Sequence, residues 1–235
     1  FYAVYHGPEG IRTIAGRIHS IAAFLEKEIN KLGYRQMNAQ YFDTLRFALP
    51  DNVSAQQVRT VALSKEVNLR YFKNGDVGMS IDETTDLAAV NVLLSIFGIA
   101  AGKDYTKAAD IPESCTIAEA FRRQSAYLTH EVFNKYHTET EMMRYIKRLD
   151  RKDISLAHSM ISLGSCTMKL NAAAEMLPLS RPEFMGMHPL VPEDQAEGYR
   201  ELIHNLSEEL KVITGFAGVS LQPNSGAAGE YAALR

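Results

Sequence analysis

The chain of 235 residues has few of the features that mark several classes of protein. Its two cysteines, Cys115 and Cys166, lie far apart and in no metal-ligand spacing. They indicate free thiols in a reducing compartment rather than a disulfide framework. There is no apolar run of membrane-spanning length, no signal peptide and, at a formal charge of −3, no basic surplus for binding nucleic acid. We therefore expect neither a membrane nor a nucleic-acid partner.

Familiar catalytic motifs are also missing. The sequence contains no Walker loop, no dinucleotide-binding fingerprint and no serine-hydrolase elbow. Its histidines form no cluster with acidic residues at metal-ligand spacing, so no metal site is predicted. The chain begins Phe-Tyr-Ala rather than with Met and stops within a helix that has just begun. We expect it to be a piece of a longer polypeptide.

The composition, 46% hydrophobic and 23% charged, is typical of a globular protein. Up to about residue 100, helical and alternating apolar patterns predict a compact α+β unit. Ser54, Thr84 or Thr85, and Gly98 are predicted to bound helices, and Asn74-Gly75 is a strong hairpin signal. The expected helices cover residues 8–32, 55–66 and 86–97, and the expected strands cover 41–49, 67–73 and 77–81.

The second half is less regular. Residues 100–118 are small and polar, which is typical of a linker or surface connection. Thr138 and Glu141 have the spacing of a capping box before an amphipathic helix. Residues 154–192 show little regular pattern but are too apolar for disorder, so they are expected to pack and could line a site. Residues 193–214 predict an amphipathic helix with a buried apolar stripe, ended by Gly215.

The last twenty residues, FAGVSLQPNSGAAGEYAALR, predict an anion site. Residues 219–221 are strand-like, residues 222–224 form a turn, and residues 225–229 open a helix. The first N–H groups of a helix lack partners within the helix, and its dipole adds positive potential there. Glycine lets a phosphate approach the backbone, and the Ser225 hydroxyl can also donate. The alternative is a capped helix without a ligand.

Two further stretches carry reactive side chains. Gly164-Ser165-Cys166-Thr167-Met168-Lys169 places a thiol, two hydroxyls and an ammonium within six residues, which could bind a carboxylate or phosphate. The alternative is a tight turn with an exposed lysine. His188-Pro189 forms a rigid turn in which the imidazole could stack on a cofactor or be only structural. The other six histidines, His19 among them, are assigned no role.

Several sequence words together resemble one family. SLGSCTMKLN (162–171), MHPLVPEDQAEGY (187–199) and LQPNSGAAGEYAALR (221–235) resemble the P-protein of the glycine cleavage system, the pyridoxal-phosphate-dependent glycine decarboxylase. YAVYHGPEGIRTIAGRIH (2–19) and VGMSIDETT (77–85) resemble it as well. The resemblance covers nearly the whole chain, with the words in the order of the family.

The resemblance implies an α/β architecture of fold type I, the aminotransferase-like fold, in a long chain made of two homologous halves. It implies three parts for this chain. Residues 1–100 correspond to the small C-terminal α+β domain of the first half, 101–120 to a linker, and 121–235 to the opening of the second half. It also implies contact with the other half, a homodimer, and a location in the bacterial cytoplasm or, in eukaryotes, the mitochondrial matrix.

The family reaction is the decarboxylation of glycine on pyridoxal 5′-phosphate, with transfer of the aminomethyl group to the lipoyl arm of the H-protein. The resemblance implies that the cofactor phosphate is held by Asn224, Ser225, Gly226 and Ala227. It implies an active-site wall of Ser165, Cys166, Thr167, Lys169, His188 and Glu230. The Schiff-base lysine of the family lies in a Cys-His-Lys motif that this chain lacks. Lys169 is therefore not that lysine, and the fragment alone is expected to be inactive.

Two other interpretations remain open. The chain could be a structural region at the interface of a fold type I protein, without a ligand of its own. It could also come from another fold type I enzyme, such as an aminotransferase or an amino-acid decarboxylase. The word GSCTMK counts against that last interpretation.

Overall fold

The computed structural model describes residues 1–152, 154 and 172–235. The chain divides into two units, Phe1–Ser162 and Leu163–Arg235, and we describe each by itself. The predicted division into residues 1–100, 101–120 and 121–235 remains a prediction.

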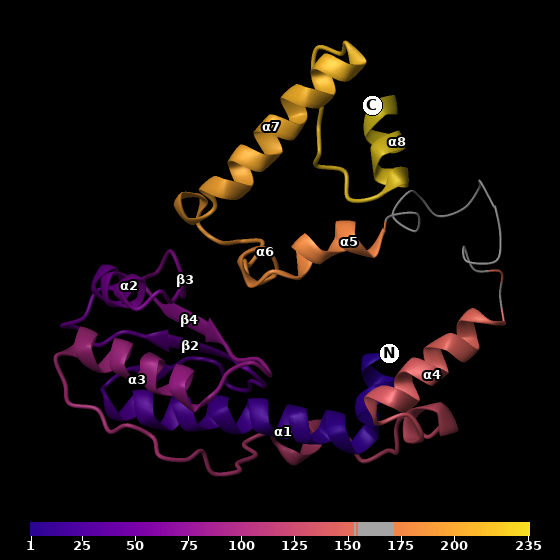
Figure 1. Cartoon of the computed structure of the whole chain (residues 1–235). Coiled ribbons are helices and arrows are strands. Elements are labelled where there is room, and N and C mark those ends of the chain that lie inside the picture. The colour runs from indigo at the N-terminus through magenta and orange to yellow at the C-terminus, as the bar shows by residue number, and fades with distance from the viewer. Residues whose placement is uncertain (153, 155–171) are drawn as a thin grey trace. The chain divides into compact units, whose positions relative to one another are not determined.

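The long first helix, α1 (Tyr2–Lys31), is interrupted near its start (Figure 1). At Gly7 the backbone takes φ 64° and ψ −177°, a conformation that essentially only glycine adopts. Pro8 follows, and the residue before a proline is disfavoured in the helical conformation. The helix predicted from residue 8 is confirmed, and a further helical segment precedes the break.

A four-stranded antiparallel sheet packs against α1. Its order is β1 (Arg35–Gln36), β2 (Thr44–Ala48), β4 (Val77–Ser80) and β3 (Arg70–Tyr71). In β2 the side chains of Leu45 and Phe47 are fully buried, because alternate residues of a strand point to the same face. The predicted strands and the hairpin at Gly75, where φ is 91°, are confirmed, although the strands are shorter than predicted. The sequence did not predict β1.

Helices α2 (Ala55–Ser64) and α3 (Leu87–Ala101) complete this core (Figure 1). Ser54 caps α2 through a reciprocal capping box with Gln57, as predicted for Ser54. The ring of Phe97 on α3 lies 5.7 Å from that of Phe47 and 5.0 Å from that of Tyr34. Helix α3 thereby packs on both the sheet and the segment that follows α1.

The helix predicted for residues 86–97 is confirmed as α3, but its predicted cap, Thr84 or Thr85, and its predicted stop, Gly98, were wrong. Asp86 caps the helix and accepts a bond of 2.8 Å from the amide of Ala89, whereas Thr84 and Thr85 donate their hydroxyls to Asp82. Those bonds lower the pKa of Asp82. The helix continues through Gly98 and ends at Gly102, where φ is 63°. A side chain at Gly98 would lie 2.6 Å from the ring of Tyr105, so this glycine allows close packing rather than ending the helix.

Residues 103–118, here called the strap, contain no helix or strand and lie along unit 1. Side chains from the core hold the strap backbone at several points. The Asn91 amide exchanges two hydrogen bonds with the backbone of Ala108, and the Ser20 hydroxyl exchanges two with that of Ser114. The predicted surface connection is therefore a surface segment that is tied to the core.

Beyond the strap, unit 1 contains two short 3₁₀ helices, η1 (Glu119–Phe121) and η2 (Glu131–Asn134), and helix α4 (Glu139–Asp150). Thr138 caps α4, as predicted, by accepting from the amide of Glu141. The η2 region packs on the break in α1, because the hydroxyl of Tyr127 donates to the carbonyl of Pro8 and the ring of His137 bonds the carbonyl of Tyr5.

The described part of unit 2 is helical: α5 (Ala173–Met176), η4 (Leu177–Ser180), α6 (Pro182–Met185), η5 (Glu193–Gln195), α7 (Glu197–Thr214) and α8 (Gly226–Leu234). Gly215 ends α7 as predicted, with φ 71°. The predicted strand at residues 219–221 was wrong, because this segment has no paired neighbour in the described structure. Mixed helix and sheet are confirmed for the chain, while fold type I remains a prediction.

The predicted buried stripe of α7 is exposed in this chain. Leu202, Ile203 and Leu206 retain 49%, 46% and 41% of their accessible surface. Within the described part of unit 2, no other helix buries these three side chains. Across residues 1–152, 154 and 172–235, the helices fall short of what a membrane span would require in length and apolar character.

Candidate functional site

Ser225 begins α8 in the manner predicted for the anion site. Its backbone is extended, with φ −159° and ψ 161°, and its hydroxyl accepts from the amide of Ala228 at 3.1 Å. Its carbonyl accepts from Gly229 at 3.0 Å, which forms the first backbone bond of the helix. Serine is a preferred residue at this position because its short side chain reaches the first-turn amides.

The geometry of a helix start leaves the amides of Gly226 and Ala227 without acceptors inside the helix. Residues Asn224 to Ala227 are exposed, and a Cβ built on Gly226 would meet no atom within 4 Å. Backbone donors, open space and the positive end of the helix dipole therefore fit a phosphate group. Asn224, Ser225, Gly226 and Ala227 form one continuous turn, whereas Glu230 lies one helical turn further along α8 and is also exposed.

The structure describes only some of the other predicted site residues. Ser165, Cys166, Thr167 and Lys169 lie outside the described residues. His188 accepts a bond of 3.0 Å from the amide of Leu190 through Nδ1, so one ring nitrogen supports its own turn. No hydrogen bond among the described residues of unit 2 joins His188 or Glu230 to Ser225. The predicted active-site wall therefore remains a prediction.

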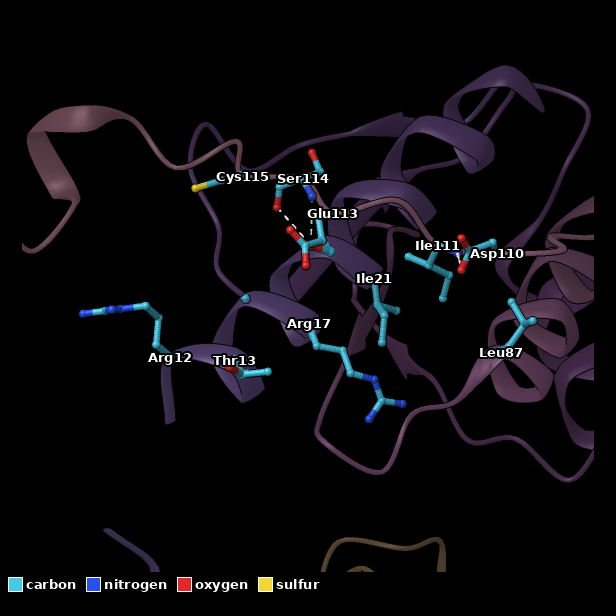
Figure 2. Close-up of a pocket in the computed structure, with 12 residues that line it drawn as sticks. Arg12, Thr13, Arg17, Ile21, Leu87, Asp110, Ile111, Glu113, Ser114 and Cys115 are labelled. Carbon is cyan, nitrogen blue, oxygen red and sulfur yellow. Dashed lines mark hydrogen bonds between the residues drawn. The ribbon is translucent and has the colours of Figure 1, made fainter. Parts of the chain in front are cut away.

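Unit 1 contains a groove that the sequence did not predict (Figure 2). Its volume is about 870 Å³, and it lies between one face of α1, the start of α3 and the strap. Thr13, Gly16 and Arg17 recur at helical spacing along α1. The groove is lined by Arg12, Thr13, Gly16, Arg17, Ser20, Ile21, Leu87, Asp110, Ile111, Glu113, Ser114 and Cys115.

The charges that line this groove balance one another. Arg12 pairs with Glu9 at 2.8 Å, and the guanidinium of Arg17 donates to the carbonyls of Glu83 and Thr85 at 3.4 and 2.9 Å. Asp110 and Glu113 supply two carboxylates on the strap side. Both arginines bind groups of the chain itself, and the two carboxylates offset their charge within the groove.

His19 has a defined environment that the sequence analysis missed. It is 2% exposed, its Nδ1 lies 2.8 Å from the carbonyl oxygen of Phe42, and its Nε2 accepts from the amide of Thr116 at 2.9 Å. The ring of Tyr41 lies 5.6 Å away, and its hydroxyl donates to Glu26. Burial, with the bond to Glu26, raises the pKa of Tyr41 to about 12. One signal was available: residue 19 lies beside Ile18 and Ala22 on the apolar side of the helix pattern.

Among the described residues, no three His, Cys, Asp or Glu side chains gather closely enough to hold a metal ion. The anion turn of α8 and the groove of unit 1 are features of the described residues that could hold a ligand of another kind.

Comparison with known proteins shows what this chain is similar to. Residues 1–97 match the family model described as glycine cleavage system P-protein. The chain is also 82% identical over all 235 residues to the glycine dehydrogenase (decarboxylating) of Bacteroides fragilis strain YCH46. It is 48% identical over 233 residues to the protein of that name from Flavobacterium johnsoniae, and 53% over 238 to that from Shewanella amazonensis.

The predicted resemblance to the P-protein is thereby confirmed. The chain spans about a quarter of the length of these relatives, 25% for the Bacteroides fragilis protein and 24% for the other two. Three-quarters of each relative therefore has no counterpart in the present sequence. The activity of those whole proteins comes to this chain only as a proposal.

Proposed function

We propose that this chain is part of a glycine dehydrogenase (decarboxylating), the P-protein that acts on glycine and passes the aminomethyl group to the lipoyl arm of an H-protein. The observation that carries the proposal is the 82% identity along the full 235 residues to the Bacteroides fragilis protein of that name. The match of residues 1–97 to the P-protein family supports it. These relatives are bacterial, which favours the cytoplasm as the location.

Pyridoxal 5′-phosphate is the proposed cofactor, and it supplies an electron sink for the decarboxylation when bound. The amides of Gly226 and Ala227 would donate to its phosphate, and the Ser225 hydroxyl and Asn224 amide lie in the same turn. Two oriented N–H donors at a helix start hold a phosphate in one position without a counter-ion. The turn would thereby fix one end of the cofactor.

The remaining residues are proposed as the wall of the substrate site. Ser165, Cys166, Thr167, Lys169, His188 and Glu230 would line the mouth through which glycine and the lipoyl arm enter. The chain contains no Cys-His-Lys motif to supply the Schiff-base lysine, so we propose that this piece alone is inactive. Its partners would be the remainder of the longer polypeptide and a second subunit.

A second function is favoured by one observation. The exposed apolar stripe of α7, with Leu202 and Leu206, is suited to an interface between parts of a larger protein. In this case the chain would support the fold without holding a ligand, and the turn at Ser225 would be only a helix cap.

Cofactor binding by the full-length parent separates the two functions. The double variant Ser225→Ala, Gly226→Pro removes the hydroxyl and one amide donor, while proline remains compatible with the first position of a helix. Hydrogen bonds to charged groups contribute about 1.5–3 kcal/mol each, so the Kd for pyridoxal phosphate should rise at least about tenfold. Titration of the aldimine absorbance measures this constant.

Ser207→Ala is the matched control, because it removes a serine hydroxyl that bonds the carbonyl of Ile203 within α7, away from the turn. The control should bind pyridoxal phosphate like the unmodified parent. If the double variant and the control have equal Kd values for pyridoxal phosphate, the turn at Ser225 does not bind the phosphate. The interface function would then be the one supported.

A further inference from the structure

Strand β3 lies at the edge of the sheet, where one side of its backbone has no neighbouring strand (Figure 1). Antiparallel strands bond a given neighbour through every second residue. The amide of Phe72 donates to the carbonyl oxygen of Asp76 at 2.9 Å. The backbone of Arg70, two residues earlier and opposite Gly78, therefore also faces β4, and that of Tyr71 points away from it. Within the part of the chain that the structure describes, no group bonds the outward N–H and C=O of Tyr71.

The outer face of the sheet carries two arginines beside one aromatic ring. Arg46 and Arg70 come from the strands on either side of β4, and both lie opposite Gly78. The ring of Phe72 lies over Gly78, since a Cβ built there would come within 2.9 Å of it. The guanidinium carbons of Arg46 and Arg70 lie 4.5 and 4.8 Å from the centre of this ring, within the range of cation–π attraction. The ring therefore helps to hold both guanidinium groups in place.

The two arginines differ in their carboxylate partners. Nε and Nη2 of Arg46 lie 2.7 Å from Oδ2 of Asp76, which is 6% exposed and also accepts from the side chain of Asn74 at 3.0 Å. Arg70 is exposed, and no hydrogen bond or ion pair joins its guanidinium group to another described residue. A guanidinium fork binds a carboxylate through two parallel hydrogen bonds. Arg70 thus offers donors for a carboxylate that the described residues do not supply.

We propose that β3, with Arg70, is a docking edge for an extended, acidic segment of a partner protein. The segment adds a strand beside β3, its backbone bonds the N–H and C=O of Tyr71, and a Glu or Asp side chain on the outer face binds Arg70. In strand addition of this kind the backbone bonds give affinity and the side chains give specificity. Arg59 of α2, 5.8 Å from the ring of Tyr71, adds positive charge at the same edge. Charge complementarity therefore selects an acidic segment.

The opposite role for Arg70 makes an opposite prediction. A charged side chain on a short edge strand can prevent pairing with other chains, and its loss would then strengthen strand addition. If Arg70 binds a carboxylate, its loss weakens strand addition. The contact with Phe72 favours the second role, because a guanidinium group that is already held in position loses less conformational freedom on binding.

Binding of a fluorescent peptide of alternating Glu and Thr to the full-length parent, measured by anisotropy at low salt, tests the proposal. The Kd should rise at least about tenfold in Arg70→Gln, because hydrogen bonds between charged groups are lost. Arg70→Lys keeps the charge but not the fork and should give an intermediate Kd. Arg144→Gln removes an exposed arginine of α4 and is the matched control, which should bind like the unmodified parent.

Two altered peptides separate the contributions of charge and backbone. Gln in place of Glu should raise the Kd at least about tenfold, and N-methylation of alternate residues, which removes backbone donors, should raise it about two- to tenfold. Equal binding of either altered peptide would overturn the proposal.

Equal or tighter binding by Arg70→Gln would also overturn it and would assign Arg70 the role of preventing strand pairing. A parent that does not bind the Glu peptide would overturn it as well. If Arg70→Gln then lowered the sedimentation coefficient of that parent, the occupant of the edge would be a second copy rather than an acidic partner.

Discussion

Two glycines of α1 differ in what they do for the backbone. Gly7 lies at the break, and a Cβ there would come within 2.9 Å of the carbonyl oxygen of Phe133. Gly16 lies in the regular helix on the floor of the groove, and a Cβ there would meet nothing within 4 Å. The same substitution should therefore have opposite effects at the two positions.

Gly7→Ala should lower the free energy of unfolding of unit 1 by about 1–3 kcal/mol, because alanine is strained at φ 64° and would also contact Phe133. Gly16→Ala should raise it by about 1 kcal/mol, since alanine is the better helix former. Urea denaturation followed by circular dichroism measures both. Destabilisation by both changes would contradict the contrast and point to a need for an open groove floor.

Secondary-structure elements were predictable where their signals are local. Ser54, Thr138 and Ser225 cap the helices expected of them, because an N-cap bonds amides two or three residues away. The start of α3 was mistaken because three cap-forming residues stand together, and Asp82 binds Thr84 and Thr85. The hydrogen bonds of the folded structure show that Asp86 is the residue that caps α3.

Asp86→Ala should reduce the free energy of unfolding by about 0.5–2 kcal/mol, because the Ala89 amide loses its acceptor. Asp86→Asn is the matched control, since it keeps the acceptor oxygen and should cost less. Thermal unfolding of the two variants and the wild type gives the comparison. Equal losses would mean that the charge, rather than the cap bond, stabilises the start of α3.

Signals that depend on distant residues were not available in the sequence. The partners of His19 are 23 and 97 positions away, so its helix position indicated burial but not what it binds. The expected strand at 219–221 needs a neighbour, and the described residues offer none. The turn at Ser225 was foreseen because its donors are adjacent in sequence, whereas the groove of unit 1 joins three separate stretches.

At the scale of the whole chain, the two units differ in what they bury. The buried hydrophobic side chains of the described residues all lie between Val4 and Met142, including Leu25 and Phe47 at 0% exposure. In the described part of unit 2 no side chain is buried. Burial of apolar surface is the main stabilising contribution to folding, so unit 1 should carry nearly all the stability of the chain.

Leu25→Ala should therefore cost about 2–5 kcal/mol of unfolding free energy, as expected for a fully buried leucine. Leu206→Ala, at the exposed stripe of α7, should cost less than about 0.5 kcal/mol. Denaturation monitored by tyrosine fluorescence compares the two changes in one chain. A cost for Leu206→Ala as large as that for Leu25→Ala would show that another surface covers α7 in solution.

The strap has a consequence for the order in which unit 1 folds. Its attachments to Leu32, Ser20 and His19 join residues 71, 94 and 97 positions apart. Contacts between such distant residues form only after long loops have closed, so the strap should dock after the helices and the sheet have assembled. Substitutions at Ser20, whose hydroxyl binds the backbone of Ser114, or at Thr116 should then speed unfolding while leaving the rate constant of folding nearly unchanged.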